Sequence, residues 1–192
     1  MLDKIKNLRQ ISGAGFVDVK KALEESGGNE QKAVEILRAK GHAKAAKKAG
    51  REAKEGIVAS YIHSNKKIGV MMQLFCETDF VAKNSDFQDL ARDIAMHIAA
   101  MNPQFIKPED VPESIIAKEK KIWKEQLKNE KKPEAIWDKI LTGKEKKFRD
   151  DISLLSQPFV KNPDITVGDL VAEKVGKIGE NIQVGKFVRY EL

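Results

Sequence analysis

Residues 68–76, which read IGVMMQLFC, constrain the fold more than any other stretch of this chain. Read as a strand, the run places apolar side chains on both faces, which is typical of a central strand covered on both sides. A second strand-like run, residues 56–63, precedes it, and Ser64-Asn65-Lys66-Lys67 between the two runs is typical of a hairpin turn. The sequence therefore predicts a β-hairpin whose second strand is central and buried on both faces.

Beyond this hairpin the apolar pattern becomes helical and then returns to that of a strand. A helix is expected at about residues 85–101, because its apolar residues recur on one face. Residues 112–150 predict two charged helices, broken apart at Lys132-Pro133, with so few core residues that the antiparallel pair is expected to project from the body. A helix at about 166–175 and an alternating strand at about 182–192 complete the predicted core.

The first forty residues predict a module of three short helices, with glycines ending them at Gly13-Ala14-Gly15, Gly27-Gly28 and Gly41. Helices this short are not stable alone and must pack together. The next stretch carries lysines among alanines, which favours a solvated helical linker. We therefore expect three parts: a module at 1–40, a basic linker at 41–55 and a core at 56–192.

The bulk composition excludes several classes of protein. The formal net charge of +6 is a mildly basic balance that indicates an anionic partner only weakly. Cys76 is the single cysteine, so no intrachain disulfide is possible, which favours a reducing compartment. Residues 1–9 lack the apolar region of a signal peptide, and no apolar stretch approaches the roughly 20 residues that span a bilayer. We expect a cytoplasmic protein with no membrane contact.

Nothing in the sequence requires covalent chemistry, so we expect neither an enzyme nor a cofactor. The nearest candidate for a phosphate loop, residues 179–186, has five residues between its glycines where such a loop has four, and Phe187 stands where a Ser or Thr would bind magnesium. The three histidines do not form a metal-binding pair, and no metal is expected. His97 is interpreted as a partly buried helix histidine rather than as a base, and Cys76 as a small core residue rather than as a nucleophile.

Nucleic-acid binding is the main alternative function. The lysine-rich linker and the basic helical hairpin could follow a phosphate backbone, as in an RNA- or ribosome-associated scaffold protein. However, aromatic residues make up only 6% of the chain and do not alternate with basic residues as on an RNA-stacking surface. We therefore expect no direct contact with nucleic acid.

Residues 78–84, TDFVAKN, stand out because they connect a buried strand to an amphipathic helix. So short a connection holds an acid, Asp79, and a phenyl ring, Phe80, near the surface. In one interpretation Phe80 enters the core and Asp79 caps a helical turn. In the other, both residues are held ready for a partner.

The run Cys76–Asn84, CETDFVAKN, resembles the signature of the elongation factor Ts family. Further stretches resemble the same family in the same order along essentially the whole chain. They are SGAG at 12–15, DVKKAL at 18–23, LRAKG at 37–41, AAKKAGR at 45–51, IAMHIAA at 94–100, PQFI at 103–106, QPFV at 157–160 and TVG at 166–168.

This resemblance implies an α+β protein. Its N-terminal module of three helices would be similar to a ubiquitin-associated (UBA) domain. Its core would contain a three-stranded antiparallel sheet, packed helices and a projecting helical hairpin at about 112–150. The family's longer members carry two related core halves, whereas this chain carries one and resembles the short forms. The short forms pair two copies, so a homodimer is expected.

The resemblance also implies a function, that of the guanine nucleotide exchange factor for elongation factor Tu (EF-Tu) during polypeptide elongation. The ring that matches Phe80 would enter between two helices of the GTPase near its magnesium ion, and Asp79 would contact the same helices. The partner-binding residues implied are Thr78, Asp79, Phe80 and Val81 in the connection; Leu8, Gly13, Phe16 and Val17 in the N-terminal module; and His97 in the core. Phe16-Val17 replaces a methionine pair usual in the family, and Val19 replaces a cysteine, but apolar character is kept.

Overall fold

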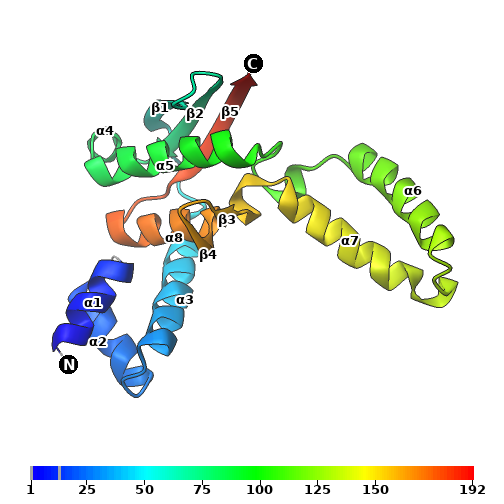
Figure 1. The fold of residues 1–192 in the computed structure, drawn as a ribbon. Helices are drawn as coiled ribbons and strands as arrows, with labels where there is room; N and C mark the ends of the chain where they lie inside the picture. The colour runs from blue at the N-terminus through cyan, green and yellow to red at the C-terminus, as the bar shows by residue number, and fades with distance from the viewer. Residues whose placement is uncertain (1, 13) are drawn as a thin grey trace. The chain divides into compact units, whose positions relative to one another are not determined.

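The computed structural model describes residues 2–12 and 14–192, apart from the side chains of Gln10 and Ile11 (Figure 1). The fold is α+β, as predicted, and combines helices with a three-stranded antiparallel sheet. It divides into two compact units, one formed by residues 1–100 and 168–192, the other by residues 101–167. No helix in the described part of the chain is both long and apolar enough to cross a membrane.

Three helices form the N-terminal part of the first unit: α1 (Leu2–Ser12), α2 (Phe16–Glu25) and α3 (Glu30–Lys48). None buries enough surface alone, so they share one core. Its buried residues are Ile5, Leu8, Val19, Ala22, Leu23, Ala33 and Leu37. The prediction that Gly41 ends the third helix was wrong, since α3 continues to Lys48 along the lysine- and alanine-rich stretch. The division into module, linker and core stays a prediction, as does the likeness of the module to a UBA domain.

The sheet has the order β1–β2–β5, formed by β1 (Glu55–Ile62), β2 (Ile68–Cys76) and β5 (Gln183–Glu191), all antiparallel. The predicted hairpin and the central position of its second strand are both confirmed. Gly56 must be glycine, because its φ is +153° and a Cβ there would lie 2.1 Å from the Leu74 carbonyl oxygen. This close approach lets β1 start alongside the end of β2.

One face of this sheet is covered by the rest of the protein, and the other is exposed. On β2 the side chains of Val70, Met72, Leu74 and Cys76 are all buried, at 1% exposure or less. The opposite side, which we call the outer sheet face, exposes large apolar side chains from all three strands. They are Val58 and Ile62 on β1, Met71 on β2, and Val188 and Tyr190 on β5. The prediction that the central strand is covered on both faces is therefore wrong for the isolated chain.

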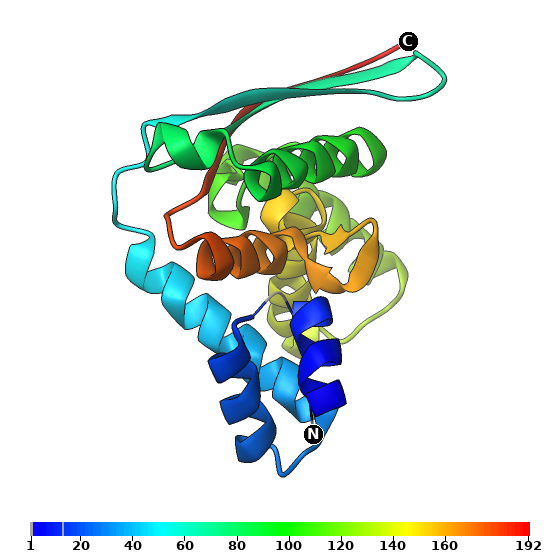
Figure 2. The ribbon, with the colours of Figure 1, turned by 90° about the vertical axis from the view of Figure 1, so that its left-hand side faces the viewer.

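Helix α5 (Ser85–Met101) lies along the covered face of the sheet, and α8 (Val167–Ile178) lies on the far side of α5 (Figure 2). The predicted helix at 85–101 is confirmed at both ends. Its apolar face supplies the core with residues that include Phe87, at 0% exposure. On its polar side, Asp86 accepts from Lys177 at 2.9 Å and from Lys174 at 3.4 Å, which fastens α8 to α5.

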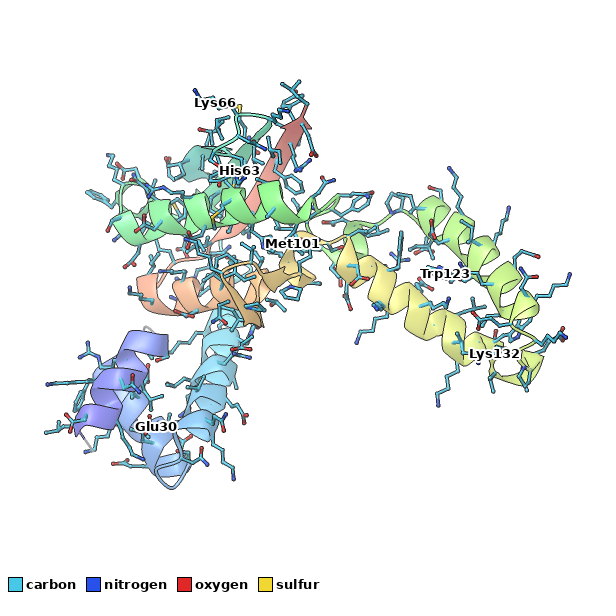
Figure 3. All side chains as sticks on the ribbon, viewed as in Figure 1. Glu30, His63, Lys66, Met101, Trp123 and Lys132 are labelled. Atoms are coloured by element: carbon cyan, nitrogen blue, oxygen red, sulfur yellow. The ribbon has the colours of Figure 1, made fainter. Side chains whose placement is uncertain are left out.

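The second unit is built around the predicted pair of helices, α6 (Glu113–Asn129) and α7 (Trp137–Asp151). Trp123 lies between them, in T-shaped contact with Phe148 at 5.8 Å between ring centroids, and Lys132 lies at the turn that joins them (Figure 3). Three residues form the buried core of the pair: Trp123, Leu127 and Leu141. The unit also contains the short elements η1 (Pro108–Asp110), η2 (Glu134–Ile136), η3 (Leu154–Ser156), β3 (Pro158–Phe159) and β4 (Asn162–Thr166).

Candidate partner-binding site

The connection between β2 and α5 forms a single helical turn, α4 (Asp79–Ala82). Thr78 is its N-cap, with extended backbone angles and an Oγ1 that accepts from the Val81 amide at 3.4 Å. Threonine suits this position because its hydroxyl satisfies an amide that a helix leaves without a partner. Ala82 is buried at 7% exposure, so one side of the turn packs on the protein while the other faces solvent. We call residues 78–82 the α4 turn.

Phe80 lies on the solvent side of the α4 turn and is 80% exposed. The interpretation that Phe80 enters the core is therefore wrong, and the interpretation that it is held at the surface is confirmed. A phenyl ring left in water forgoes about 1.5–3 kcal/mol of burial free energy. Exposure of this degree at the apex of an ordered turn makes Phe80 available to another molecule.

Asp79 is exposed beside the ring and is paired within its own turn. The Lys83 ammonium donates to its carboxylate at 2.8 Å, one helical turn along the chain. This hydrogen bond holds the pKa of Asp79 below its ordinary value and the pKa of Lys83 above its ordinary value. Both groups therefore stay charged at neutral pH, and the exposed tip of the turn presents a phenyl ring next to a carboxylate.

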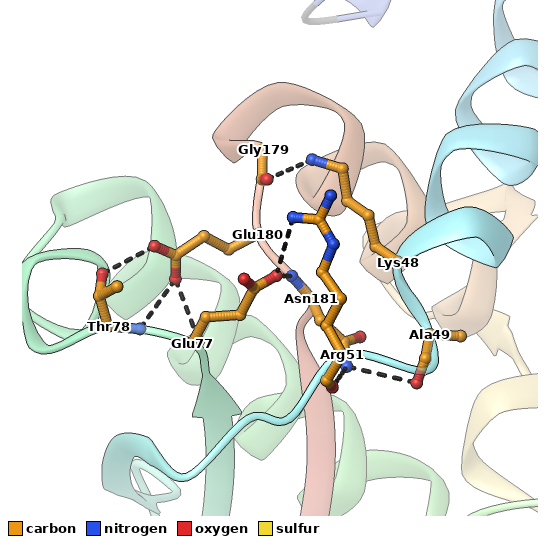
Figure 4. A network of polar contacts seen from close by, with 8 residues as sticks. All are labelled: Lys48, Ala49, Arg51, Glu77, Thr78, Gly179, Glu180 and Asn181. Carbon is orange, nitrogen blue, oxygen red and sulfur yellow. Dashed lines mark hydrogen bonds and ion pairs between the residues drawn. The ribbon is translucent and has the colours of Figure 1, made fainter.

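Polar contacts from two other segments hold the base of the α4 turn (Figure 4). The Glu180 carboxylate accepts from the amides of Glu77 and Thr78 and from the Thr78 hydroxyl. The backbone amide of Asn181 donates to Glu77 Oε1 at 2.6 Å, and the side-chain amide of Asn181 donates to the Arg51 carbonyl at 2.7 Å. We use the name turn network for these contacts, which involve residues 77, 78, 180 and 181 and the carbonyl of Arg51.

Cys76, the last residue of β2, also contacts this turn. Its side chain is fully buried, and its thiol donates to the Thr78 carbonyl at 3.2 Å. Burial, with the nearby Glu180 carboxylate, raises the pKa of the thiol to about 11. A thiol that stays protonated is a poor nucleophile, so its interpretation as a small core residue is confirmed.

The residues expected in the N-terminal module do not all lie at the surface. Phe16 and Val17 begin α2 and are exposed, at 45% and 62%. Leu8 is buried at 1% in the core of the three helices, so it supports the surface rather than forming it. Gly13 lies outside the residues that the structure describes.

His97 is fully buried within α5, at 0% exposure. The interpretation as a buried helix histidine is confirmed, although burial is complete rather than partial, and direct contact of the side chain with a partner does not fit this burial. Sequence reasoning missed Glu180 and Asn181. Glu180 follows a glycine in a loop between a helix and a strand, and only the fold brings it to residues 77 and 78, so no local pattern could have identified it.

Comparison with known proteins gives one consistent result. A family profile described as "Elongation factor TS" matches residues 30–192. The elongation factor Ts of Thermodesulfovibrio yellowstonii is 56% identical over 188 residues, which cover 98% of this chain and 94% of that protein. Those of Carboxydothermus hydrogenoformans and Fervidobacterium nodosum are 54% and 52% identical over the same share of this chain, covering 87% and 95% of their own lengths.

Proposed function

This chain belongs to the elongation factor Ts family, and from that membership we propose that it releases GDP from the translational GTPase EF-Tu. As a translation elongation factor of this kind, it would work in the cytoplasm and perform no covalent chemistry. The observation that carries the proposal is Phe80, a phenyl ring 80% exposed on an ordered turn.

The proposed mechanism is insertion of the α4 turn into the GTPase. Phe80 enters between two helices near the magnesium site, Asp79 contacts the same helices, and Thr78 and Val81 flank the contact. Displacement of these helices weakens the binding of the GDP phosphates and of magnesium by the GTPase. Linkage requires that the factor and GDP weaken each other's affinity by the same factor. Burial of one phenyl ring contributes about 1.5–3 kcal/mol, which is too little to displace a tightly bound nucleotide alone, so other surfaces must contribute.

The N-terminal module is the second proposed contact. Phe16 and Val17 present an apolar pair at the start of α2, and neither is drawn into the module's own core. Docking of this pair on the GTPase domain would supply binding energy that does not depend on the α4 turn. The two surfaces then have separate roles, since the module provides affinity and the α4 turn provides the distortion that releases GDP.

The outer sheet face is proposed to bind a second copy of the chain. Five large apolar side chains from three strands are exposed there, and an apolar patch that spans a whole sheet is typical of an interface. A two-fold partner presents the same patch in return, which makes a homodimer the simplest cover.

The alternative function, an RNA- or ribosome-associated scaffold, would use the lysines of the α6–α7 pair. Lys121, Lys124 and Lys128 recur at helical spacing on α6 and are exposed. The exposed Glu125 lies between Lys124 and Lys128, however, so the charge is mixed. Salt separates the two functions, because phosphate contacts weaken steeply with ionic strength and apolar insertion does not.

The test is stopped-flow release of a fluorescent GDP analogue from EF-Tu, with and without this chain, at low and moderate salt. We expect a large acceleration of release that persists at moderate salt. Titration of labelled tRNA and ribosomal RNA in the same buffers provides the comparison. Failure to accelerate release at any concentration, together with salt-sensitive RNA binding, would establish the scaffold function instead.

A further inference from the structure

The Glu180 carboxylate makes three hydrogen bonds to the start of the α4 turn. Its Oε2 accepts from the Glu77 amide at 3.0 Å and from the Thr78 amide at 3.1 Å, and its Oε1 accepts from the Thr78 hydroxyl at 2.7 Å (Figure 4). We propose that Glu180 is the positioning residue that fixes the direction of Phe80 for nucleotide release. This inference rests on the proposed function of the α4 turn.

The first step of the argument concerns what directs Phe80. Phe80 is 80% exposed, so contacts of its own side chain contribute little to its placement. Its direction is therefore set by the backbone of the α4 turn. That backbone starts at Thr78, whose Oγ1 donates to Glu180 and accepts from the Val81 amide. A continuous line of hydrogen bonds thus runs from Glu180 across the turn that carries Phe80.

The second step concerns the two amides that Glu180 binds. The ladder of β1 and β2 ends at the pair Glu55 and Cys76, so Glu77 and Thr78 lie just beyond the sheet. An ionised carboxylate that binds two successive amides replaces the missing strand partner with stronger, charge-assisted bonds. Glu180 therefore holds the backbone of the two residues after β2 in place, up to the N-cap of α4.

The third step is that Glu180 itself is held firmly. Asn181 is buried at 3% exposure, and its amide donates to Glu77 Oε1 while its side chain donates to the Arg51 carbonyl. Lys48, at the end of α3, donates to the Gly179 carbonyl. Both neighbours of Glu180 are thus tied to the chain that leaves α3. Together with the Lys48–Gly179 hydrogen bond, the turn network joins the end of α3 to the base of the α4 turn.

These contacts give Glu180 a role distinct from that of a residue needed only for folding. A site that acts by insertion loses efficiency when its geometry loosens, even if its chemical groups remain. Loss of Glu180 should leave Phe80 present but variable in direction. The docking surface of Phe16 and Val17 should be unaffected, so the factor should still bind EF-Tu and yet release GDP slowly once bound.

The experiment compares Glu180→Ala and Glu180→Gln in stopped-flow release of a fluorescent GDP analogue, titrated with factor to saturation. We expect Glu180→Ala to lower the maximal release rate about 10-fold while the half-saturating concentration changes less than about threefold. Glu180→Gln should recover most of the rate, because an amide oxygen can still accept from both backbone amides and the amide nitrogen can donate to Thr78 Oγ1. Glu191→Ala, which removes an acid bound by Arg189 on β5, is the matched control and should leave the rate unchanged.

A second measurement keeps the inference testable without the partner. Hydrogen exchange of the Glu77 and Thr78 amides, followed by NMR, should accelerate at least about 10-fold in Glu180→Ala while amides of β2 keep their protection. Unchanged protection at these two amides would overturn the inference. Loss of protection throughout the first unit would also overturn it, because Glu180 would then be a general folding residue.

The double variant Phe80→Ala with Glu180→Ala separates the inference from the proposed function. If Glu180 acts through the ring, the double variant releases GDP as slowly as Phe80→Ala alone. Additive losses would overturn the positioning role while leaving the proposed function intact. If Phe80→Ala exchanges at the full rate, the proposed insertion of Phe80 fails although GDP release stands, and the amide protection data then still decide whether Glu180 orders the turn.

Discussion

The α4 turn and the outer sheet face both expose apolar side chains, but they do so in different ways. The α4 turn exposes one ring, Phe80, and surrounds its base with hydrogen bonds from Thr78 and Glu180. The outer sheet face exposes five large side chains that share a flat surface, in the register that places Val188 opposite Met71. One region is a protrusion on a fixed base and the other is a broad patch.

The difference indicates two kinds of partner. A single ring can be exposed without risk of aggregation, and its shape suits entry into a gap in another protein. A patch that crosses three strands has to be covered by a surface of equal size, which a second copy supplies by symmetry. We therefore expect substitutions to separate assembly, which depends on the sheet, from nucleotide release, which depends on the turn.

The largest effect is expected from Met71→Arg on the outer sheet face. Met71 is 54% exposed in the single chain, and in a dimer its replacement would bury a charge without a partner, at a cost of roughly 3–5 kcal/mol. The dimer dissociation constant should then rise by about 100-fold or more. Light scattering over a dilution series measures this directly. Ile122→Arg on α6, at a site with 50% exposure, is the matched control and should stay dimeric.

A wild-type chain that scatters as a monomer at micromolar concentration would remove the distinction between the two regions. Full nucleotide-exchange activity of a monomeric wild-type chain would likewise show that exchange does not need the dimer.

The next effect is expected from Phe80→Ala in the α4 turn. Loss of about 1.5–3 kcal/mol of ring burial in the exchange complex corresponds to a decrease of roughly 10- to 150-fold in GDP release. The free energy of unfolding should change by less than about 0.5 kcal/mol, because the ring is exposed in the free protein. Stopped-flow release and urea denaturation provide the two measurements. Ile136→Ala, at an exposed apolar site in η2 directly before α7, should affect neither.

If Phe80→Ala instead melts several degrees lower and exchanges at the wild-type rate per folded molecule, the ring belongs to the protein's own core. The inserted group would then have to be sought elsewhere.

A smaller effect is expected from Asp79→Ala. The carboxylate is exposed and bonded to Lys83, so its contact with a partner would contribute modestly, and GDP release should slow by about 2- to 5-fold. Lys83→Ala breaks the same ion pair but keeps the carboxylate, so it should slow release less than Asp79→Ala does. Equal losses in the two variants would show that the pair stiffens the turn and that Asp79 makes no partner contact of its own.

The smallest effect is expected from Lys128→Ala near the end of α6. Its side chain is exposed at a distance along the chain from both regions, and screening weakens any long-range contribution. GDP release should stay within about twofold of wild type at moderate salt. A loss larger than that of Asp79→Ala would bring the α6–α7 pair into the interface and would favour the alternative function.

Sequence reasoning placed the elements well where apolar periodicity was strong. The β1–β2 hairpin, α5 and the α6–α7 pair lie where their patterns predict, because each has to bury one continuous face. The prediction that Gly41 ends a helix was wrong. The alanines and lysines on both sides of Gly41 favour a helix, and α3 continues through it. Sequence reasoning also failed for β2, because apolar residues on both faces indicate two covers and cannot tell a cover within the chain from a second molecule.

The candidate site was predictable in part for a similar reason. Thr78 and Phe80 are neighbours in sequence, and a cap followed by a ring is a local feature. Glu180 lies about one hundred residues further along the chain and reaches Thr78 only through the fold. Burial of Leu8 was equally hard to predict, since an apolar residue on one helical face gives the same pattern whether that face contacts a partner or the protein's own core.

The order of the strands in the sheet has a consequence for synthesis of the chain. β2 receives one neighbour at once, from β1, but its other neighbour, β5, is translated about one hundred residues later, after the whole of the second unit. Until then, one edge of an apolar central strand has no strand to pair with, which is a state prone to misassociation on a crowded polysome. The N-terminal helices, whose contacts are local, can form early, whereas the sheet and the Glu180 contacts must wait. A nascent chain would thus acquire its turn network, and with it the fixed direction of Phe80, among its last folding events.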